Sequence, residues 1–458
     1  MTALMDSLAD LVGTSHVLTG DAIGEDYAHD EALTASPQAP AAVVRPATTD
    51  EVASVLRAAD EAGTPVTARG AGTGLCGASI PRPDAIMISF ERMNEILEID
   101  TDNQVAVVQP GVTLEQLDDA LAPLGYVYPV YPGENSATIG GNVATNAGGM
   151  RAVKYGVTRH RVLGLEAVLP TGEVMRTGGK FVKATTGYDL TQLIIGSEGT
   201  LALVTEATLK IERRPEHSAT VLAPFATLAE ITGAIPEIIR RGVDPTILEY
   251  IDLLGMEATT ESEDLDLGIP QEIRETALAY LVVLLEGKDA DRVEEDVETL
   301  GELLTELGAL DLYVLPEQAA TRLLVARERA FWVSKARGAD DIIDVVVPRA
   351  SIPDYLQTVS DLAQENGAFT AGAGHAGDGN VHLAVFQPDA EKRRALMHGI
   401  LEAGMALGGA ISAEHGIGSE KQAYFLELED PVKIDLMRRI KTAFDPRGIL
   451  NPGTLLDS

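Results

Sequence analysis

This sequence of 458 residues is poor in cysteine and has no long apolar run. Its single cysteine, Cys76, excludes an internal disulfide and is typical of the reducing cytoplasm, where we expect the protein to work. Because no apolar run of roughly 18 residues occurs, the sequence predicts that this is not an integral membrane protein. The first residues, MTALMDSLADLVG, contain acids and no basic start, unlike a secretory signal.

Positive charge is scarce as well. The chain has 35 lysines and arginines against 70 acidic residues, a formal net charge of −35. Nucleic acid and anionic membrane surfaces would be repelled, so the sequence predicts no nucleic-acid partner. An anionic substrate would need local positive charge from an arginine, a metal or helix N-termini. The hydrophobic content of 45% indicates a soluble globular protein, and the length suits two or three domains.

Lysine and arginine are absent from the stretch that we expect to organise the chain, residues 131–149, Y-P-G-E-N-S-A-T-I-G-G-N-V-A-T-N-A-G-G. Closely spaced glycines let a backbone approach a ligand, and their N–H groups can point at an anion. We therefore expect a loop that binds a diphosphate or a polar ring edge by backbone. A linker is the alternative, but Ile139, Val143 and Ala144 interrupt the polar residues as buried positions would.

Earlier in the chain lies another glycine motif, Gly72-Thr-Gly74-Leu-Cys-Gly77, which we call the first glycine motif and which matches the G-x-G-x-x-G of dinucleotide-binding folds. That motif requires a helix directly after its last glycine, and the prolines at 81 and 83 argue against one. The sequence thus disfavours a nicotinamide dehydrogenase. It leaves a diphosphate held between two loops, with Arg69 either the nearest cation or a structural arginine at a strand end.

The periodicity of the chain predicts an α+β protein. A small α/β unit precedes residue 131, with strands at 41–45, 65–68, 85–91 and 105–109 and a helix that Thr49 caps and Gly63 ends. Strands follow at 162–169, 173–176 and 201–211. Beyond a boundary near 213–215, strands at 281–285, 312–315 and 342–347 alternate with helices such as 292–307, which suggests a sheet covered on one face. Two more helices are expected at 392–407 and 432–444.

A histidine-bearing hairpin is predicted at residues 374–382, G-H-A-G-D-G-N-V-H. If Asp378 and Gly379 form a two-residue turn, His375 lies directly opposite His382, with Cβ atoms ~5 Å apart. The two imidazoles could share a metal ion or form a half-buried polar pair. The turn S-A-E-H-G-I-G at 412–418 adds Glu414 and His415. Two histidines and a carboxylate are a recurring divalent-metal set, although Glu414 could also be an ordinary helix-end carboxylate.

The motifs together carry a family resemblance. V-T-A-R-G-A-G-T-G (66–74), the glycine stretch and G-S-E-G-T-L (196–201) resemble the vanillyl-alcohol-oxidase, PCMH-type FAD-binding fold. The hairpin, residues 412–418 and F-D-P-R-G-I-L-N-P-G (444–453) resemble the group of glycolate oxidase flavin subunit, D-lactate dehydrogenase and D-2-hydroxyglutarate dehydrogenase. The resemblance implies four parts: an N-terminal helical segment (1–36), a two-subdomain FAD-binding domain (37–213), an α+β substrate domain of the FAD-linked oxidase C-terminal type with a metal site (214–425), and a C-terminal segment that returns to the FAD domain (426–458).

The same resemblance implies non-covalent FAD, because Thr73 stands where some members carry a flavin-linked histidine. The residues that it assigns to FAD lie in the two glycine loops, in the 196–209 segment and near the C-terminus: Arg69, Gly70, Ala71, Gly72, Thr73, Gly74, Pro132, Gly133, Thr138, Gly140, Gly141, Asn142, Thr145, Asn146, Gly148, Gly149, Glu198, Gly199, Val204 and Asn451.

For catalysis, the resemblance assigns a divalent metal (Zn, Mn or Fe) to His375, His382 and Glu414, the base to His415 and the substrate carboxylate to Arg327. It implies oxidation of a small anionic D-2-hydroxy acid, D-lactate or glycolate, to the 2-oxo acid, with hydride transfer to flavin N5. The electron acceptor is open among a quinone, a cytochrome, an electron-transfer flavoprotein and oxygen. The oligomeric state is open too, a homodimer included.

Three positions depart from the hydroxyglutarate enzymes. Phe331 and about Ile342 stand where those enzymes carry a threonine and a lysine for the second carboxylate, and Ala384 replaces an asparagine. We therefore expect a short monocarboxylate, with D-2-hydroxyglutarate or a bulkier 2-hydroxy acid as the alternative. Two other classes are weighed: a flavin electron-transfer subunit of a complex, and a metal-dependent hydrolase that uses only the three metal ligands.

Overall fold

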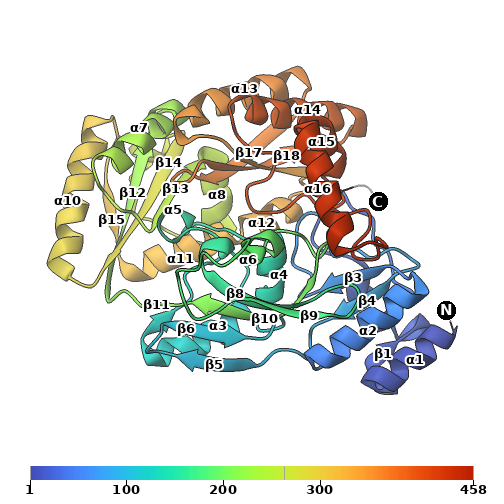
Figure 1. Cartoon of the computed structure of the whole chain (residues 1–458). Helices are drawn as coiled ribbons and strands as arrows, with labels where there is room; N and C mark the ends of the chain where they lie inside the picture. The colour runs from blue at the N-terminus through green and yellow to red at the C-terminus, as the bar shows by residue number, and fades with distance from the viewer. Residues whose placement is uncertain (1, 263, 457–458) are drawn as a thin grey trace. The chain divides into compact units, whose positions relative to one another are not determined.

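The computed structural model describes residues 2–262 and 264–456. The chain forms two compact units (Figure 1). The first contains the chain up to Ala147, Val157–Arg214 and everything from Glu414 onward; the second contains Gly148–Gly156 and Pro215–Ala413. The division after Arg214 lies one residue from the predicted boundary. The return to the first unit comes at Glu414 rather than at the predicted residue 426, and the place of 148–156 in the second unit was not predicted.

A small parallel sheet opens the first unit. Its strand order is β1-β2-β4-β3, with β1 antiparallel at the edge. Helix α2 (Thr49–Ala62) buries Val52, Val55, Leu56 and Ala59 as predicted. Its N-cap is Thr48, whose hydroxyl accepts from the N–H of Glu51, one residue before the predicted cap. The other bounds are α1 (Thr2–Val12), β1 (Val17–Leu18), β2 (Ala42–Val44), β3 (Val66–Arg69) and β4 (Ile86–Ser89).

An antiparallel sheet of order β5-β6-β10-β8-β9 forms the second layer of this unit. Against it packs α4 (Ile139–Thr145), whose Ile139 and Val143 share a core with Leu165 and Leu209. The remaining elements are β5 (Ile96–Asp100), β6 (Val105–Val108), α3 (Leu114–Leu121), β7 (Tyr126–Val127), β8 (Val162–Val168), β9 (Val174–Gly178), α6 (Leu190–Ile194), β10 (Leu203–Lys210) and β11 (Glu212–Arg213).

Helix α4 corrects the expectation that residues 131–149 form a loop throughout. Thr138 caps its start by accepting from the N–H of Gly141, and Asn146, in the left-handed region at φ 54°, ends it. The apolar residues at i and i+4, which the sequence marked as buried, are the inward face of this helix. Two glycines at its start concealed the helical pattern, because glycine lowers helix propensity.

The C-terminal segment completes the first unit with α15 (Gln422–Leu428) and α16 (Pro431–Phe444). Lys441 at the end of α16 donates to the backbone oxygens of Thr200 and Leu450, both at 2.8 Å. Leu450 extends the first sheet by a parallel bridge to Val66. The end of the chain is thus built into the same layer as the first glycine motif.

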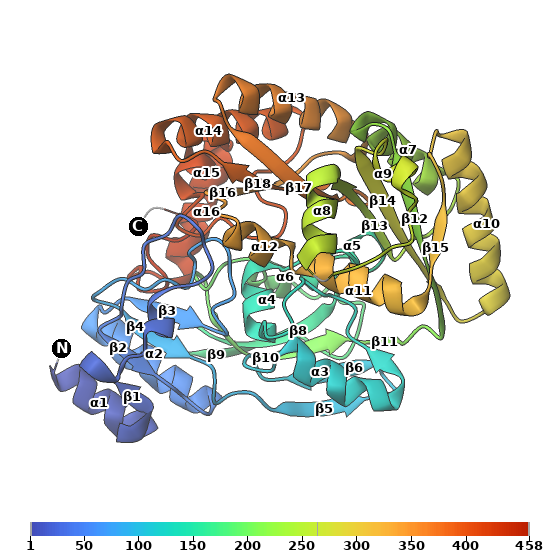
Figure 2. The same cartoon turned by 180° about the vertical axis from the view of Figure 1, so that it is seen from behind.

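The second unit is one antiparallel seven-stranded sheet of order β15-β12-β14-β13-β17-β18-β16 (Figures 1 and 2). Its strands are β12 (His217–Phe225), β13 (Ile247–Asp252), β14 (Ala279–Gly287), β15 (Tyr313–Leu315), β16 (Asp341–Val346), β17 (Phe369–His375) and β18 (Asn380–Phe386). Its helices are α5 (Ala152–Tyr155), α7 (Leu228–Arg240), α8 (Leu253–Ser262), α9 (Gln271–Arg274), α10 (Ala290–Glu306), α11 (Glu317–Glu328), α12 (Ala330–Ala336), α13 (Ile352–Glu365) and α14 (Ala390–Ala406).

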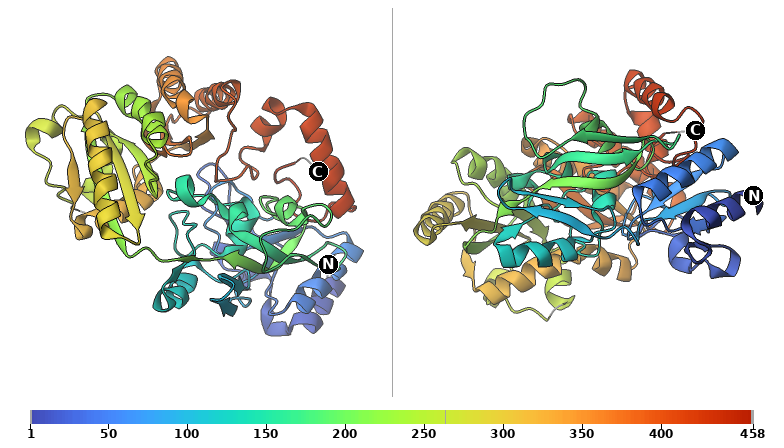
Figure 3. Two further views of the ribbon diagram at one scale, coloured as in Figure 1. Left: turned by 60° about the vertical axis from the view of Figure 1, so that its left-hand side comes forward. Right: turned by 60° about the horizontal axis from the view of Figure 1, so that its bottom comes forward.

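Helices cover both faces of this sheet, so the prediction of a single covered face is wrong. Tyr280 and Val282 of β14 pack with Met256 of α8 and Leu323 of α11. The alternate residues of β14 are also buried, on the face where α7 and α10 lie (Figure 3). A central strand covered on both sides is a continuous apolar run, and the run at 279–285 was the signal for it. Among the described residues, no helix is both long and apolar enough to cross a membrane.

Candidate active site

The two glycine motifs of the first unit meet each other. A Cβ added at Gly70, directly after β3, would collide with the hydroxyl of Thr138, the cap of α4. A Cβ added at Gly140 would lie 2.6 Å from Cβ of Pro110. Glycine is therefore required at these positions by close approach rather than by a turn. From the sequence we expected the two glycine loops to bind one ligand together. The structure brings Gly70 and the start of α4 into contact.

Other predicted FAD residues of this unit lie on segments after α6 and near the C-terminus, and two of them hydrogen-bond to the glycine motifs or their flanks. Glu198 and Gly199 lie between α6 and β10, with the N–H of Glu198 donating to the backbone oxygen of Ala144 at 2.8 Å. Asn451 donates through Nδ2 to the backbone oxygens of Ala78 and Glu198, both at 2.8 Å. Val204 is a half-buried residue of β10. Gly148 and Gly149, in contrast, fall in the short segment that belongs to the second unit.

Arg69 is held by the N-terminal segment. Its Nη1 donates to the backbone oxygen of His29 at 2.7 Å, and its guanidinium lies over the ring of Tyr27. Burial lowers the pKa of Arg69, while the charge of Asp30 acts in the opposite direction. The guanidinium also fills the space beside Gly72, where a Cβ would collide with it. These contacts favour the structural role for Arg69 over a role as a cation for the ligand. Its side chain packs against the first glycine motif and supports the conformation of that motif.

Unsatisfied polar atoms test whether this region suits FAD. Nδ2 of Asn142 on α4 is buried without a hydrogen-bond partner in the described chain, and so is the hydroxyl of Ser79 after the first glycine motif. Buried donors without partners are rare and costly in a native protein. A polar ligand bound at these motifs is one way to supply such partners. The residues present therefore fit a flavin dinucleotide.

The histidine hairpin of the second unit has another register than predicted. His375 ends β17 opposite Asn380, and His382 on β18 is opposite Ala373. The turn has four residues, 376–379, because Gly377 donates to the backbone oxygen of Leu248 on the neighbouring strand and the N–H groups of Asp378 and Gly379 both point at His375 O. The predicted two-residue turn is wrong. Both histidines still share one face of the sheet, as diagonal neighbours with ring centroids 4.7 Å apart.

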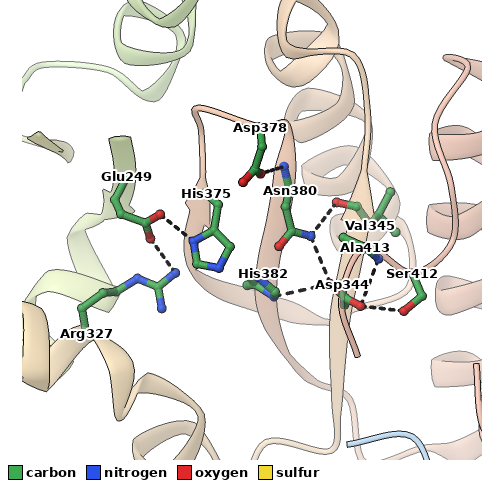
Figure 4. A network of polar contacts seen from close by, with 10 residues as sticks. All are labelled: Glu249, Arg327, Asp344, Val345, His375, Asp378, Asn380, His382, Ser412 and Ala413. Carbon is green, nitrogen blue, oxygen red and sulfur yellow. Dashed lines mark hydrogen bonds and ion pairs between the residues drawn. The ribbon is translucent and has the colours of Figure 1, made fainter. Parts of the chain in front are cut away.

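A buried carboxylate joins one of these histidines to the predicted substrate arginine (Figure 4). Glu249 on β13 is fully buried; its Oε1 lies 2.5 Å from Nδ1 of His375 and its Oε2 lies 2.9 Å from Nη2 of Arg327 on α11. The contact favours the proton on Nδ1 of His375 and leaves Nε2 as the ligand atom. A buried carboxylate is costly unless it is paired, and here two partners offset that cost.

A second buried carboxylate, Asp344 on β16, serves the other histidine (Figure 4). Its Oδ1 accepts from Nδ2 of Asn380 at 3.0 Å and lies 3.8 Å from Nδ1 of His382. Its Oδ2 accepts from the hydroxyl of Ser412 at 2.7 Å and from the N–H of Ala413 at 3.2 Å. Asp344 thus fixes the chain immediately before Glu414 and His415. Those two residues open the C-terminal part of the first unit.

The donor set fits a divalent metal. Each histidine turns Nδ1 towards a buried carboxylate, which is the usual arrangement around metal-ligating imidazoles. The sequence did not reveal Glu249 and Asp344, which lie 126 and 38 residues before their histidines in the chain. The only signal for either was an acidic residue inside an apolar strand, I-L-E-Y-I and I-I-D-V-V.

Comparisons with known proteins agree with this geometry. A model described as FAD linked oxidases, C-terminal domain, matches residues 214–455, and one described as FAD binding domain matches residues 40–178. An uncharacterized FAD-linked oxidoreductase of Mycobacterium tuberculosis is 59% identical over 455 residues, 99% of each chain. A D-lactate dehydrogenase of Anaerostipes hadrus is 37% identical over 458 residues, 97% of this chain and 95% of that one.

A solved structure of p-cresol methylhydroxylase with substrate bound shares the fold, with a TM-score of 0.81 at 18% identity over 100% of this chain and 97% of that one. Fold and sequence together define an FAD-linked oxidoreductase with a PCMH-type cofactor domain. The chain belongs to the FAD-linked oxidase family, among the 2-hydroxy acid dehydrogenases.

Proposed function

We propose that this protein oxidises a small D-2-hydroxy acid, D-lactate or glycolate, to the corresponding 2-oxo acid. The observation that carries the proposal is the chain of contacts from Arg327 through Glu249 to His375, which puts a buried guanidinium beside a pair of histidines. Such a site offers an anion receptor next to metal-ligand atoms. The similarity to a D-lactate dehydrogenase supports the same substrate class.

Arg327 would bind the substrate carboxylate. Among the described residues, its Nε and Nη2 have no hydrogen-bond acceptor of good geometry, although Nη2 is paired in charge with Glu249. A guanidinium presents two parallel N–H groups, which match the two oxygens of a carboxylate. This local cation would counter the acidic field of a protein with a net charge of −35.

His375, His382 and Glu414 would hold a divalent metal. A metal in this position acts as a Lewis acid that lowers the pKa of a bound hydroxyl. The two histidines are oriented by Glu249 and Asp344, and Glu414 follows Ala413, whose N–H is bound by Asp344. We expect Zn, Mn or Fe, which suit imidazole and carboxylate ligands.

His415 would accept the proton of the substrate hydroxyl on a ring nitrogen. An imidazole is suited to this step because its pKa lies near neutral pH. FAD, when bound to the glycine motifs, supplies the two-electron acceptor for the hydride from the substrate Cα. The balance is complete: the substrate loses a proton to His415 and a hydride to the cofactor. The onward acceptor stays a prediction, as do the cytoplasmic location and a homodimer.

The size of the substrate would be limited by apolar residues. Phe331 and Trp332 on α12 pack edge to face with ring centroids 5.2 Å apart, and Lys335 lies over the Trp332 ring at 5.3 Å. Ile342 on β16 pairs with Ala384 on β18. None of the residues at positions 331, 342 and 384 offers a charge to a distal carboxylate. This supports a monocarboxylate over D-2-hydroxyglutarate.

Anaerobic reduction of the bound flavin tests the proposal. The purified protein is mixed without oxygen with a panel of D- and L-lactate, glycolate and D-2-hydroxyglutarate, and the loss of the yellow absorption band is followed. We expect D-lactate or glycolate to bleach the flavin faster than the L-enantiomer and the dicarboxylate. Bleaching by none of the four would refute the proposed substrate class, and equal rates with both enantiomers would refute the D-preference.

A further inference from the structure

Glu198 is the meeting point of three segments of the first unit. Its N–H donates to Ala144 on α4, and its backbone oxygen accepts from Asn451. Its carboxylate accepts two backbone N–H groups, Ile417 to Oε1 and Gly418 to Oε2, both at 2.7 Å. The residue therefore contacts the glycine stretch with its main chain and the loop after His415 with its side chain.

This arrangement has an energetic cost. Glu198 is a non-glycine residue at φ 52°, in the left-handed region, a strained backbone conformation that persists only when its surroundings fix it. Its carboxylate is 5% exposed, and burial raises the pKa of Glu198 to about 6, against the two backbone N–H groups and Lys421, which lower it. A side chain with no task other than filling space would avoid the cost of the buried carboxylate by being apolar, and glycine would avoid the backbone strain.

The loop that receives this carboxylate is fixed at a second point. The N–H groups of Ser419 and Glu420 donate to the backbone oxygen of Cys76, at 3.1 and 3.2 Å. Gly418, at φ 54°, lies so close to Cys76 that an added Cβ would collide with that oxygen. Residues 417–420 are thereby clamped between Glu198 and the first glycine motif. His415 is two residues before the first of the clamped amides.

We propose that Glu198 is a positioning residue for His415: its carboxylate fixes the 417–418 backbone and sets the place of the base relative to the glycine stretch that cradles the cofactor. This inference rests on the proposed role of His415 as the base. It changes the role that the resemblance gave to Glu198, from cofactor contact to support of the base loop. This role also explains why residue 198 is a carboxylate. Each of its two oxygens accepts a hydrogen bond from one backbone N–H group.

Glu166 provides a matched control. It is another buried glutamate of the first unit, 4% exposed on β8, and it accepts from the hydroxyls of Thr49 and Thr205 and pairs with Arg176. None of the hydrogen bonds and ion pairs described for Glu166 involves residues 414–420. Glu166→Gln therefore reproduces the loss of a buried charge without the loss of a contact to the base loop.

The test compares Glu198→Gln, Glu166→Gln and His415→Ala, each loaded with FAD. Glutamine keeps the size of Glu198 but presents an NH₂ to one of the two N–H groups. We expect Glu198→Gln to retain its flavin, to exchange the amide hydrogens of 417–418 at least about tenfold faster, as loss of a hydrogen bond to a charged group implies, and to slow single-turnover bleaching by between about tenfold and about 100-fold. Glu166→Gln should show neither effect.

The outcomes separate this inference from the proposed function. Bleaching of Glu198→Gln at the wild-type rate would overturn the positioning role, while a slow His415→Ala would leave the proposed function intact. A rate that falls only in proportion to lost FAD would make Glu198 a cofactor residue and would equally overturn it. Bleaching of His415→Ala at the wild-type rate would instead refute the base assignment itself.

Discussion

The glycine motifs of the first unit and the histidine hairpin of the second build their sites by opposite means. Around α4 the chain uses neutral backbone, and the positions that matter are those where no Cβ fits, such as Gly70 and Gly140. On the sheet of the second unit, charged side chains meet in a buried setting: Glu249 between Arg327 and His375, and Asp344 beside His382.

This difference between a backbone-built and a charge-built region suits the two kinds of ligand in the proposed function. A large cofactor that stays bound is held by shape and backbone hydrogen bonds, which need no compensating charge. The small anion of the proposed reaction would meet charged side chains whose positions are fixed by buried ion pairs. We therefore expect substitutions in the first region to reduce cofactor retention, and substitutions in the second to reduce retention of the proposed metal and the reaction rate.

The largest expected effect is in the chemistry alone. His415→Ala removes the proposed base while it leaves the glycine motifs untouched, so turnover should fall by roughly 10²–10⁴-fold and the protein should stay yellow. Steady-state rates with the 2-hydroxy acid that bleaches the wild type, together with the flavin-to-protein absorbance ratio, measure both. A variant that loses its colour along with its activity would show that the two regions are not separable in this way.

A smaller effect is expected one contact away from the proposed metal ligands. Glu249→Gln removes the charge that orients His375, so the affinity for a divalent metal should fall by about 10–100-fold. Metal content after dialysis against graded chelator measures this without any substrate. Glu286→Gln, a half-buried carboxylate on strand β14 of the same sheet, is the control and should keep its metal. Equal metal loss in both variants would mean that sheet stability, not ligand orientation, was changed.

The sequence could predict those parts of the site whose structure is determined by the local residue pattern. The glycine motifs, the helix of 49–62 and the histidines on one sheet face all follow from spacing within a few residues. The turn length of the hairpin was wrong because a tertiary bond from Gly377 to Leu248 decided it. No local rule weighs a contact between strands so far apart in the chain.

The partners of the histidines could not be predicted for the same reason. Glu249 and Asp344 reach His375 and His382 only because β13 and β16 flank the hairpin in the sheet order. The sequence pattern shows Glu249 and Asp344 as acidic residues within apolar strands. Such a pattern indicates a buried charge, but it does not identify the residue with which that charge is paired. Likewise, the glycines of α4 concealed its helical pattern, and residues 148–156 could not be assigned to the second unit because they are far in the chain from the rest of it.

The backbone-built region can be tested by adding a single methyl group. Gly70→Ala places a Cβ against Thr138, and overpacking of this kind costs about 1–3 kcal/mol. We expect FAD affinity to fall by up to about 100-fold in equilibrium titration of apoprotein. Gly233→Ala in α7 of the second unit, where nothing lies within 4 Å of the added Cβ, should leave FAD affinity unchanged. Unaltered binding by Gly70→Ala would contradict a cradle whose shape depends on that glycine.

The smallest effect concerns a half-buried carboxyl group of the second unit, Glu328 at the end of α11. Burial raises the pKa of Glu328 from 4.5 to about 7, although Arg151, Arg327 and Arg329 lower it. The folded protein thus holds this proton more tightly than the unfolded chain, so the contribution of Glu328 to the free energy of unfolding declines as pH rises from about 4.5 to about 7.

Glu328→Gln removes that dependence. At about pH 5 the variant and the wild type should unfold at similar urea concentrations, and at about pH 8 the variant should be the more stable. Glu294→Gln, on the exposed face of α10, controls for the loss of one surface acid and should show no such pH dependence. A Glu328→Gln difference that is the same at both pH values would mean that Glu328 has the same pKa in the folded and the unfolded chain, and that its arginine neighbours offset its burial.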